Sequence, residues 1–170
     1  ENFNDDLSEW NLDSAISTNG MFVNCKNFNQ DLSNWNVSSV RDMESMFQGA
    51  ISIDFSIADW NVESVENFND IISNSGISKI KYSELLCAWS QQNLKKIDDG
   101  EKQFSAKGCE YSMDAIVSRN MVSDKIGMKD SGVVRDFLLT AVSFVTVAKL
   151  KTNADTTYHN KNSCDFWSET

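Results

Sequence analysis

The sequence predicts an α/β fold, a solenoid of 25-residue strand-helix repeats closed by a helical C-terminal cap. The first observation behind this prediction is a tryptophan followed by an asparagine, which recurs at one interval, at Trp10, Trp35 and Trp60. The second is that apolar columns keep the same period. A constant period of this length is typical of a solenoid, whose single repeats are too small to bury their own apolar face. The apolar columns are Leu7, Leu32 and Ile57, and Phe3, Phe28 and Ile53.

Three repeats fill residues 1–76, and each contains one extended and one helical stretch. In the second repeat, polar neighbours surround Leu32, which predicts a short strand over residues 31–33 with Leu32 pointing inward. Apolar residues then follow at steps of three and four, which indicates one face of a helix that Ser38 or Ser39 can cap. The expected face consists of Val40, Met43, Met46, Phe47 and Ala50.

Residues 77–132 have the position and composition of a cap, which a solenoid needs to cover the open end of its core. The amphipathic stretch at 82–89 predicts a helix that extends as far as Leu94, and a second helix is expected at about 111–125. The residues that this second helix offers to the core are Met113, Ile116, Val117, Met121 and Val122. Residues 133–170 form a tail whose structure the pattern does not predict. Its apolar run at 137–148 is too short to span a bilayer, so no membrane insertion is expected.

The chain has 170 residues, a net charge of −10 and a pI of about 4.5, so it forms one domain or part of a longer array. An acidic surface repels phosphate backbones and anionic membranes, which argues against nucleic acid as a partner. The charge also fits a role in solubility alone. The repeat pattern is already running at Asn2, so we expect that any signal sequence is not in this chain.

The residue pattern predicts no catalytic residues, no metal site and no cofactor. The chain has a single histidine, His159, and its four cysteines lie too far apart for a zinc site. Cys25 occupies a column of small residues and is expected to be a buried thiol. Cys87 and Cys109 flank one loop, and a disulfide between them or two separate thiols are both open; a disulfide would indicate an oxidising compartment. The acidic residues at 98–101 are expected to be solvated charge in that loop and lack the spacing of a calcium site.

The tryptophans and the asparagines that follow them are expected to be structural. Equivalent side chains of stacked repeats lie about 4.8 Å apart, so the asparagines can pair with turn backbone and with one another. The tryptophans are expected to pack in the core, with an exposed platform for carbohydrate as the alternative. The predicted ladder consists of Trp10, Asn11, Trp35, Asn36, Trp60 and Asn61.

A binding surface, if present, is expected on the face of the short strands. Residues that alternate with buried Leu7, Leu32 and Ile57 must point outward on that side. They form rows of small polar and acidic groups, which suit a protein or glycan partner of basic character. The alternative is that they only keep this face hydrated. The candidate binding residues are Asp6, Ser8, Glu9, Asp31, Ser33, Asn34, Ser56 and Asp59.

The string FNQDLSNWNVSSV at residues 28–40, followed by Met43 and Met46-Phe47, resembles the repeat of the BspA-like leucine-rich repeat surface proteins. This family is also described as DUF285 or the Treponema pallidum-type leucine-rich repeats. The resemblance covers residues 2 to about 132, with a degenerate third repeat. It implies a leucine-rich-repeat-like solenoid that is secreted or displayed on the cell surface, where it mediates adhesion or protein–protein binding. It implies no catalytic residues.

Two functions therefore stand beside each other. The first is a non-enzymatic module that binds a protein or glycan. The alternative is a structural or assembly element of a filament, envelope or virion, which would self-associate through the repeat edge at its N-terminal end.

Overall fold

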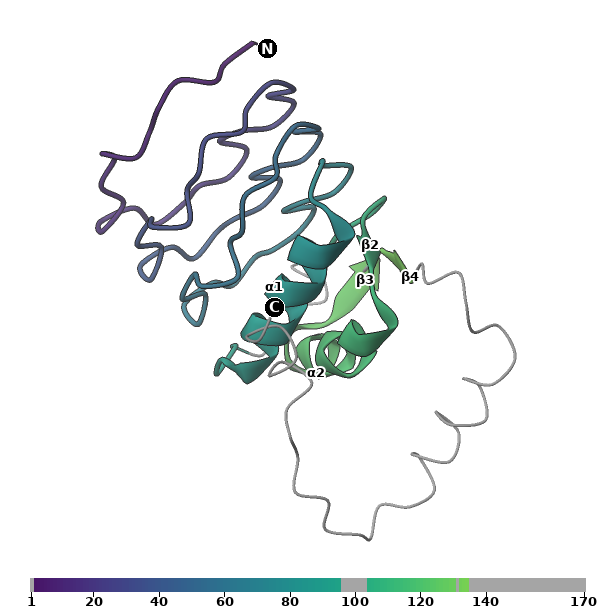
Figure 1. The fold of residues 1–170 in the computed structure, drawn as a ribbon. Helices are drawn as coiled ribbons and strands as arrows, with labels where there is room; N and C mark the ends of the chain where they lie inside the picture. The colour runs from purple at the N-terminus through teal and green to yellow at the C-terminus, as the bar shows by residue number, and fades with distance from the viewer. Residues whose placement is uncertain (1, 96–103, 131, 135–170) are drawn as a thin grey trace, which may run out of the picture.

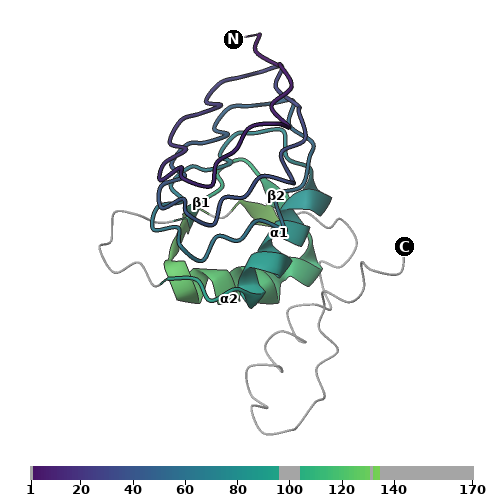
Figure 2. The ribbon, with the colours of Figure 1, turned by 90° about the vertical axis from the view of Figure 1, so that its left-hand side faces the viewer.

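The computed structural model describes residues 2–95, 104–130 and 132–134. Residues 2–76 form three successive coils of 25 residues that lie side by side, and the cap follows at the end of the third coil (Figure 1). Seen along the stack, the coils overlie one another as nested loops (Figure 2). Residues equivalent in sequence therefore form columns along the stack.

The coils are built from turns and contain no α-helix. Within residues 2–76, the only β-structure is a pair of isolated parallel bridges, from Ser17 to Asp42 and from Asp42 to Asn67. The strand expected at residues 31–33 and the helix expected over 40–50 are therefore both wrong. The apolar residues of the expected helix are nevertheless fully buried, so their spacing identified the core correctly.

An alternation of backbone hydrogen bonds explains why a turn segment has helix-like spacing. The amides of Met21 and Val23 close turns within the first coil, onto carbonyls three residues back at 3.2 and 3.1 Å. The amides of Gly20 and Phe22 instead cross to carbonyls of the second coil, both at 2.8 Å. Successive three-residue turns bring residues at steps of three and four to one face, as a helix does. A helix would use every one of these amides internally and leave none to join the coils.

Two columns in this segment have the left-handed backbone conformation, which an α-helix does not tolerate. Their φ values lie between 53° and 70°. Glycine, asparagine and aspartate reach this region at low cost, and all of these positions except Ser45 have one of the three residue types. The columns are Gly20, Ser45 and Asp70, and Asn24, Gly49 and Asn74.

The cap begins with α1 (Lys79–Gln91), whose first turn is capped by the Ser78 hydroxyl, an acceptor for the Lys81 amide. Its buried face includes Tyr82, Leu85, Leu86 and Trp89, as the sequence predicts, and Leu94 is buried beyond its end. Gln92 fastens this end to the third coil. Its side chain donates to the Trp60 carbonyl and accepts from the Val62 amide, each at 2.8 Å.

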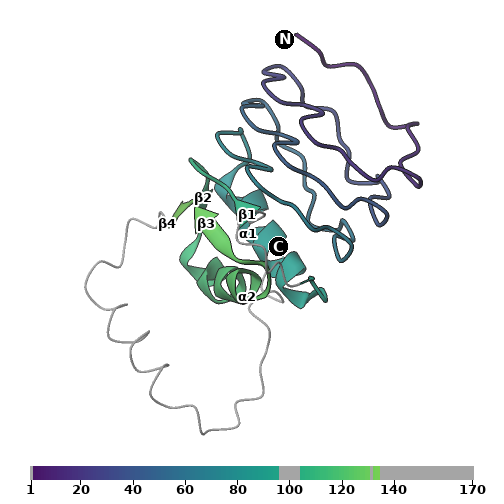
Figure 3. The same cartoon turned by 180° about the vertical axis from the view of Figure 1, so that it is seen from behind.

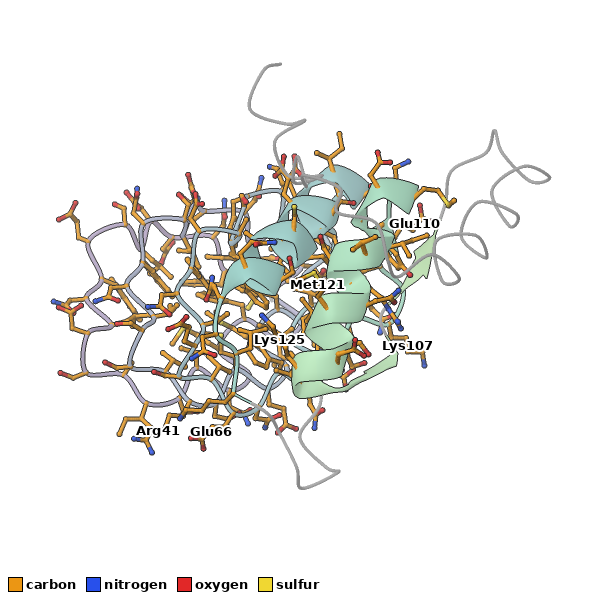
Figure 4. All side chains as sticks on the ribbon, turned by 90° about the horizontal axis from the view of Figure 1, so that it is seen from below. Arg41, Glu66, Lys107, Glu110, Met121 and Lys125 are labelled. Atoms are coloured by element: carbon orange, nitrogen blue, oxygen red, sulfur yellow. The ribbon has the colours of Figure 1, made fainter. Side chains whose placement is uncertain are left out.

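The rest of the cap combines short strands with a second helix (Figure 3). Strand β1 (Phe104–Ser105) pairs in parallel with β3 (Met128–Asp130), and β2 (Glu110–Tyr111) pairs in parallel with β4 (Val133–Val134). Between them lie the 3-10 helix η1 (Met113–Ala115) and α2 (Ile116–Ile126). Lys125 of α2 ties the two helices together, because its Nζ donates to the carbonyls of Ser90 and Gln92 at 2.9 and 2.7 Å (Figure 4).

The orientation of α2 differs from the expectation. Val122 is fully buried, but Val117 and Met121, which were expected in the core, are 61% and 39% exposed. The helix turns a face with Ser118 and Ile126 inward. Apolar residues lie on two sides of α2, so their pattern alone does not determine which side is buried.

One aromatic core runs from the coils into the cap. The rings of Phe22 and Phe28 stack at 4.1 Å, and Phe22 and Phe47 stack at 5.5 Å across two coils. At the other end, Phe68 of the third coil lies 5.5 Å from Trp89 and 6.2 Å from Phe104. The cap therefore buries the end of the core that the coils leave open.

The cysteines confirm the buried thiol expected at Cys25 and decide whether Cys87 and Cys109 are joined, which the sequence left open. Cys25 and Cys109 are buried thiols, whereas Cys87 is disulfide-bonded, so Cys87 and Cys109 are not joined to each other. The Cys109 sulfur lies 3.1 Å from the Ile72 carbonyl, which fixes it in the core. The acidic loop at 98–101, the apolar run at 137–148 and His159 lie outside the described residues.

Candidate binding surface

Three of the candidate binding residues hold turns. The side chains of Asp6, Asp31 and Ser56 each accept a hydrogen bond from the amide two residues further on, at 2.9, 2.9 and 3.3 Å. Such bonds stabilise turns locally. These residues are therefore committed to the coil itself, and replacing them would change the backbone as well as the surface.

The asparagines after the tryptophans do the same at the next corner of each coil. The Oδ1 atoms of Asn11, Asn36 and Asn61 accept from amides two residues on, at 2.7, 3.2 and 3.1 Å. The bond that crosses between coils joins Asn36 Nδ2 to Asp13 Oδ1 at 2.7 Å. The asparagines thus bind turn backbone as expected, but Asn36 reaches the neighbouring coil through an aspartate.

An amide ladder between coils lies in a column that sequence reasoning missed. Asn4 Oδ1 accepts from the Asn29 amide at 2.9 Å, and Asn29 Oδ1 accepts from the Asp54 amide at 2.7 Å. The signal was present, because these three residues are spaced by the repeat period. It went unused because the tryptophan–asparagine pair is the more conspicuous column.

The tryptophan column divides into two kinds of environment. Trp35 and Trp60 are 5% and 1% exposed, and their indole nitrogens donate to the Leu7 and Leu32 carbonyls of the preceding coil at 3.1 and 3.0 Å. Trp10, in the first coil, is 54% exposed. The two buried tryptophans therefore join each coil to the one before it. Of the three tryptophans in this column, only Trp10 has an exposed ring.

The remaining candidates form an exposed row at the tips of three turns. Glu9, Asn34 and Asp59 are exposed, and their side chains make no hydrogen bond or ion pair with the described residues. They occupy turns, so the expected strand face does not exist and the candidates lie along an edge of the stack. We call Glu9, Asn34 and Asp59 the turn-tip row. Ser8 and Ser33 flank it, and the backbone amide of each is bonded to Asp6 and Asp31 respectively.

The turn-tip row ends at a shallow depression of about 310 Å³ between the third coil and α1. Asp59 of the third coil and Glu84 of α1 both line it. The residues that line it are Ser56, Ala58, Asp59, Glu84, Cys87, Ala88 and Gln91.

Two other acidic groups of the third coil form ion pairs with lysines of the cap. Lys81 lies 3.3 Å from Asp54, and Lys95 lies 2.8 Å from Glu66. The described residues include no group of three or more side chains able to hold a metal ion. In the same part of the chain, no helix is both long and apolar enough to cross a bilayer.

Asp6 has a shifted pKa that makes a turn sensitive to pH. The Ser8 amide, followed by the Ser8 hydroxyl, holds the pKa of this carboxyl below its usual value, since both donate to the charged form. The contribution of Asp6 to stability is therefore complete above the unfolded-state pKa and is lost as pH falls through the lower folded-state pKa.

We expect Asp6→Asn to be less stable than the parent chain at neutral pH and to approach it in acid. Asparagine keeps the acceptor oxygen but carries no charge, so the difference between the two chains should shrink below about pH 4. Urea midpoints measured for both chains from pH 7 to pH 3 would check this. A difference that stays constant over this range would show that the carboxylate charge has no role in the turn.

The comparisons with known proteins identify the family. Residues 1–106, more than half of the chain, match the family described as Mycoplasma protein of unknown function, DUF285. The chain belongs to the DUF285 family. The DUF285 match spans the three coils, α1 and β1, and it confirms the membership that the repeat pattern predicts. No curated protein and no solved structure matches the chain significantly. Because the function of DUF285 proteins is unknown, function must be argued from the surface.

Proposed function

We propose that this DUF285 chain is a non-enzymatic binding module that engages a protein or glycan along its turn-tip row. The observation that carries the proposal is the contrast between two neighbouring columns. Asp6 and Asp31 accept hydrogen bonds within turns, whereas Glu9, Asn34 and Asp59 are exposed and have no partner in the part of the chain that the structure describes. Polar side chains that make no hydrogen bond or ion pair with the described residues, and that recur in register along the stack, are suited to an extended partner.

Charge supports a partner of basic character. The chain has a net charge of −10, and two of the three residues in the turn-tip row are acids. Complementary charge raises the association rate and makes it fall with salt. Nucleic acid fits poorly for the same reason.

The class and location of the protein belong to this proposal. We place the stack among leucine-rich-repeat-like solenoids of the BspA-like type, which supports a secreted or cell-surface location and adhesion as the setting. The coil period and the continuous core between coils support the solenoid class.

The test is a paired substitution within the turn-tip row. Glu9→Lys combined with Asn34→Lys should abolish saturable binding to a basic member of a panel of purified proteins and glycans, because both changes place positive charge where the partner is positive. Binding of the parent chain should weaken as ionic strength rises. Biolayer interferometry at several salt concentrations measures both effects.

A matched control separates the surface from net charge. Asp114→Lys with Asn120→Lys alters the charge by the same amount at exposed positions of the cap. This control should bind as the parent chain does. Equal loss in both variants, or a panel in which nothing binds saturably, would contradict the proposal.

A second candidate function is assembly through the N-terminal repeat edge. Hydrogen-bonding groups of the first coil that lack partners among the described residues favour it. Carbonyls of the second coil accept amides from the first, but the equivalent carbonyls of Ser17, Asn19 and Met21 accept none from the described residues. Trp10 is exposed where Trp35 and Trp60 each bond to a preceding coil. A further coil with outward amides would satisfy this edge.

The edge offers donors as well as acceptors. The Arg41 amide donates to the Ile16 carbonyl and the Glu66 amide to the Arg41 carbonyl, whereas the equivalent Ile16 amide has no acceptor among the described residues. Light scattering separates the two functions, because a binding module that does not assemble should be a monomer at all concentrations. Concentration-dependent growth that Trp10→Asp prevents would favour the assembly role.

A further inference from the structure

We propose that Asn19–Gly20 is a site of spontaneous deamidation, that pairing of the first two coils restrains the reaction, and that its acidic product releases the first coil. The reaction replaces a side-chain amide by a carboxylate, with water as the co-reactant and no enzyme. This chemistry is independent of the proposed function. It acts on the coil that carries Glu9 of the turn-tip row and the exposed Trp10.

An asparagine followed by a glycine is suited to this reaction, and Asn19–Gly20 is the one such pair in the sequence. Glycine has no side chain to hinder the approach of its own amide nitrogen. That nitrogen attacks Cγ of the asparagine, a succinimide ring closes and ammonia leaves. Water then opens the ring at either carbonyl and gives aspartate or isoaspartate. In isoaspartate the main chain runs through Cβ and is therefore longer by one atom.

Pairing with the second coil engages both reacting groups. The Gly20 amide donates to the Glu44 carbonyl at 2.8 Å, and the Asn19 side-chain amide donates to the Asp42 carboxylate at 3.2 Å. The Gly20 nitrogen must lose its proton and turn towards Cγ before the ring closes, so its bond to Glu44 has to break first. Asn19 is exposed, so water already reaches its side chain. The step that limits the reaction is therefore local separation of the two coils.

The first coil has fewer contacts to break than its neighbour. Among the described residues it pairs with one coil, whereas the second coil pairs with two. Local opening costs least free energy where few contacts are lost. When opening and closing are faster than the chemical step, the rate follows the population of the open form. Deamidation at Asn19 should therefore report how often the first coil separates from the second.

The product is incompatible with the contact that it replaces. Asp42 Oδ2 lies 3.2 Å from Asn19 Nδ2 and 3.5 Å from Ser17 Oγ, and both groups donate to it. A carboxylate at residue 19 has no proton to donate and repels the Asp42 carboxylate. Isoaspartate would also displace the amides that follow, including that of Phe22, from the carbonyls of the second coil. Because the ammonia is lost, the modified coil does not return to its paired state.

The first experiment compares the folded and unfolded full chain. Peptide mapping by mass spectrometry, at mildly alkaline pH and over increasing times, measures conversion at Asn19 in buffer and in concentrated urea. Conversion should be at least about tenfold faster in urea, where no pairing restrains it. Asn69, the equivalent residue of the third coil, is followed by Asp70 and should stay intact in both. An Asn19 that is stable in urea, or that converts equally fast in the folded chain, would overturn the proposal.

Two matched variants test whether the pairing of the first two coils controls the rate. Trp35→Phe keeps a ring but removes the indole bond to the Leu7 carbonyl of the first coil. In the folded chain it should raise the rate at Asn19 roughly fivefold, the change in open population that one lost hydrogen bond of ordinary strength produces. Trp60→Phe removes the same bond between the second and third coils and should leave the rate near that of the parent chain. Equal acceleration in both variants, or none in Trp35→Phe, would contradict this control.

Asn19→Asp reproduces the aspartate product and tests release of the coil. Hydrogen exchange should become at least about fivefold faster at the amides of Phe22 and Asn24, which cross to the second coil at 2.8 Å. The equivalent amides of Phe47 and Gly49 cross to the third coil and should exchange as in the parent chain. Unchanged exchange at Phe22 and Asn24 would show that the product does not release the first coil.

Discussion

A chain that ends at Ser78 is expected to lose cooperative folding. This truncation removes α1 and everything after it, and with them the cover over the third coil. Phe68 loses its contacts with Trp89 and Phe104, at 5.5 and 6.2 Å, and the turn at Trp60 and Val62 loses Gln92. The fully buried side chains of Val62, Ile71 and Ile72 are in the same coil.

The size of the effect follows from the area exposed. Uncovering a large apolar side chain costs roughly 1.5–3 kcal/mol, and several are uncovered together. A domain of this size has a total stability of roughly 5–15 kcal/mol. The loss is therefore comparable with the whole stability, and the shortened chain should be unfolded or aggregated.

Circular dichroism melts and light scattering on the shortened chain measure this outcome. A chain that begins at Asn27 is the control, since it lacks the first coil but keeps the cap. Removing the first coil leaves an edge of the same kind as the present one, so this control should still melt cooperatively. A chain ending at Ser78 that stayed soluble, monomeric and cooperatively folded would refute the role of the cap.

The repeat period determined most of what could be predicted about the fold. Val40, Met43 and Met46 were placed in the core from their spacing, and all three are fully buried. The same spacing suggested a helix, because three-residue turns and helical turns both bring such positions to one face. What decides between them is the backbone, and the informative residues were Gly20, Asn24 and their equivalents with positive φ.

The candidate surface was predictable in location but not in the roles of its residues. Alternation around buried Leu7 placed Asp6 and Ser8 correctly outside the core. It could not reveal that Asp6 is tied to the Ser8 amide while Glu9 has no partner among the described residues, because both are acids beside the same turn. Glu84 joins Asp59 only through packing of α1 on the third coil, which lies beyond any local pattern.

Trp35→Ala is expected to be among the most damaging single substitutions in this chain. Trp35 is 5% exposed, its ring lies 6.1 Å from Phe22, and its indole nitrogen donates to the Leu7 carbonyl at 3.1 Å. Removing a large buried aromatic side chain costs about 3–5 kcal/mol through lost burial and the cavity left behind. The Leu7 carbonyl would also lose a partner inside the structure.

Trp10→Ala is the matched control, because Trp10 occupies the same column but is 54% exposed. Its replacement should cost less than about 1 kcal/mol, since little buried area is lost and the cavity is open to solvent. Urea unfolding of both variants would measure the difference between them. If the two cost the same, the indole bond between coils contributes little, and the backbone hydrogen bonds that cross between coils, with the stacked phenylalanine rings, hold the coils in register. A large difference would show that each tryptophan stabilises its contact with the coil before it. The exposed indole of Trp10 would then be able to make the same contact with a further coil.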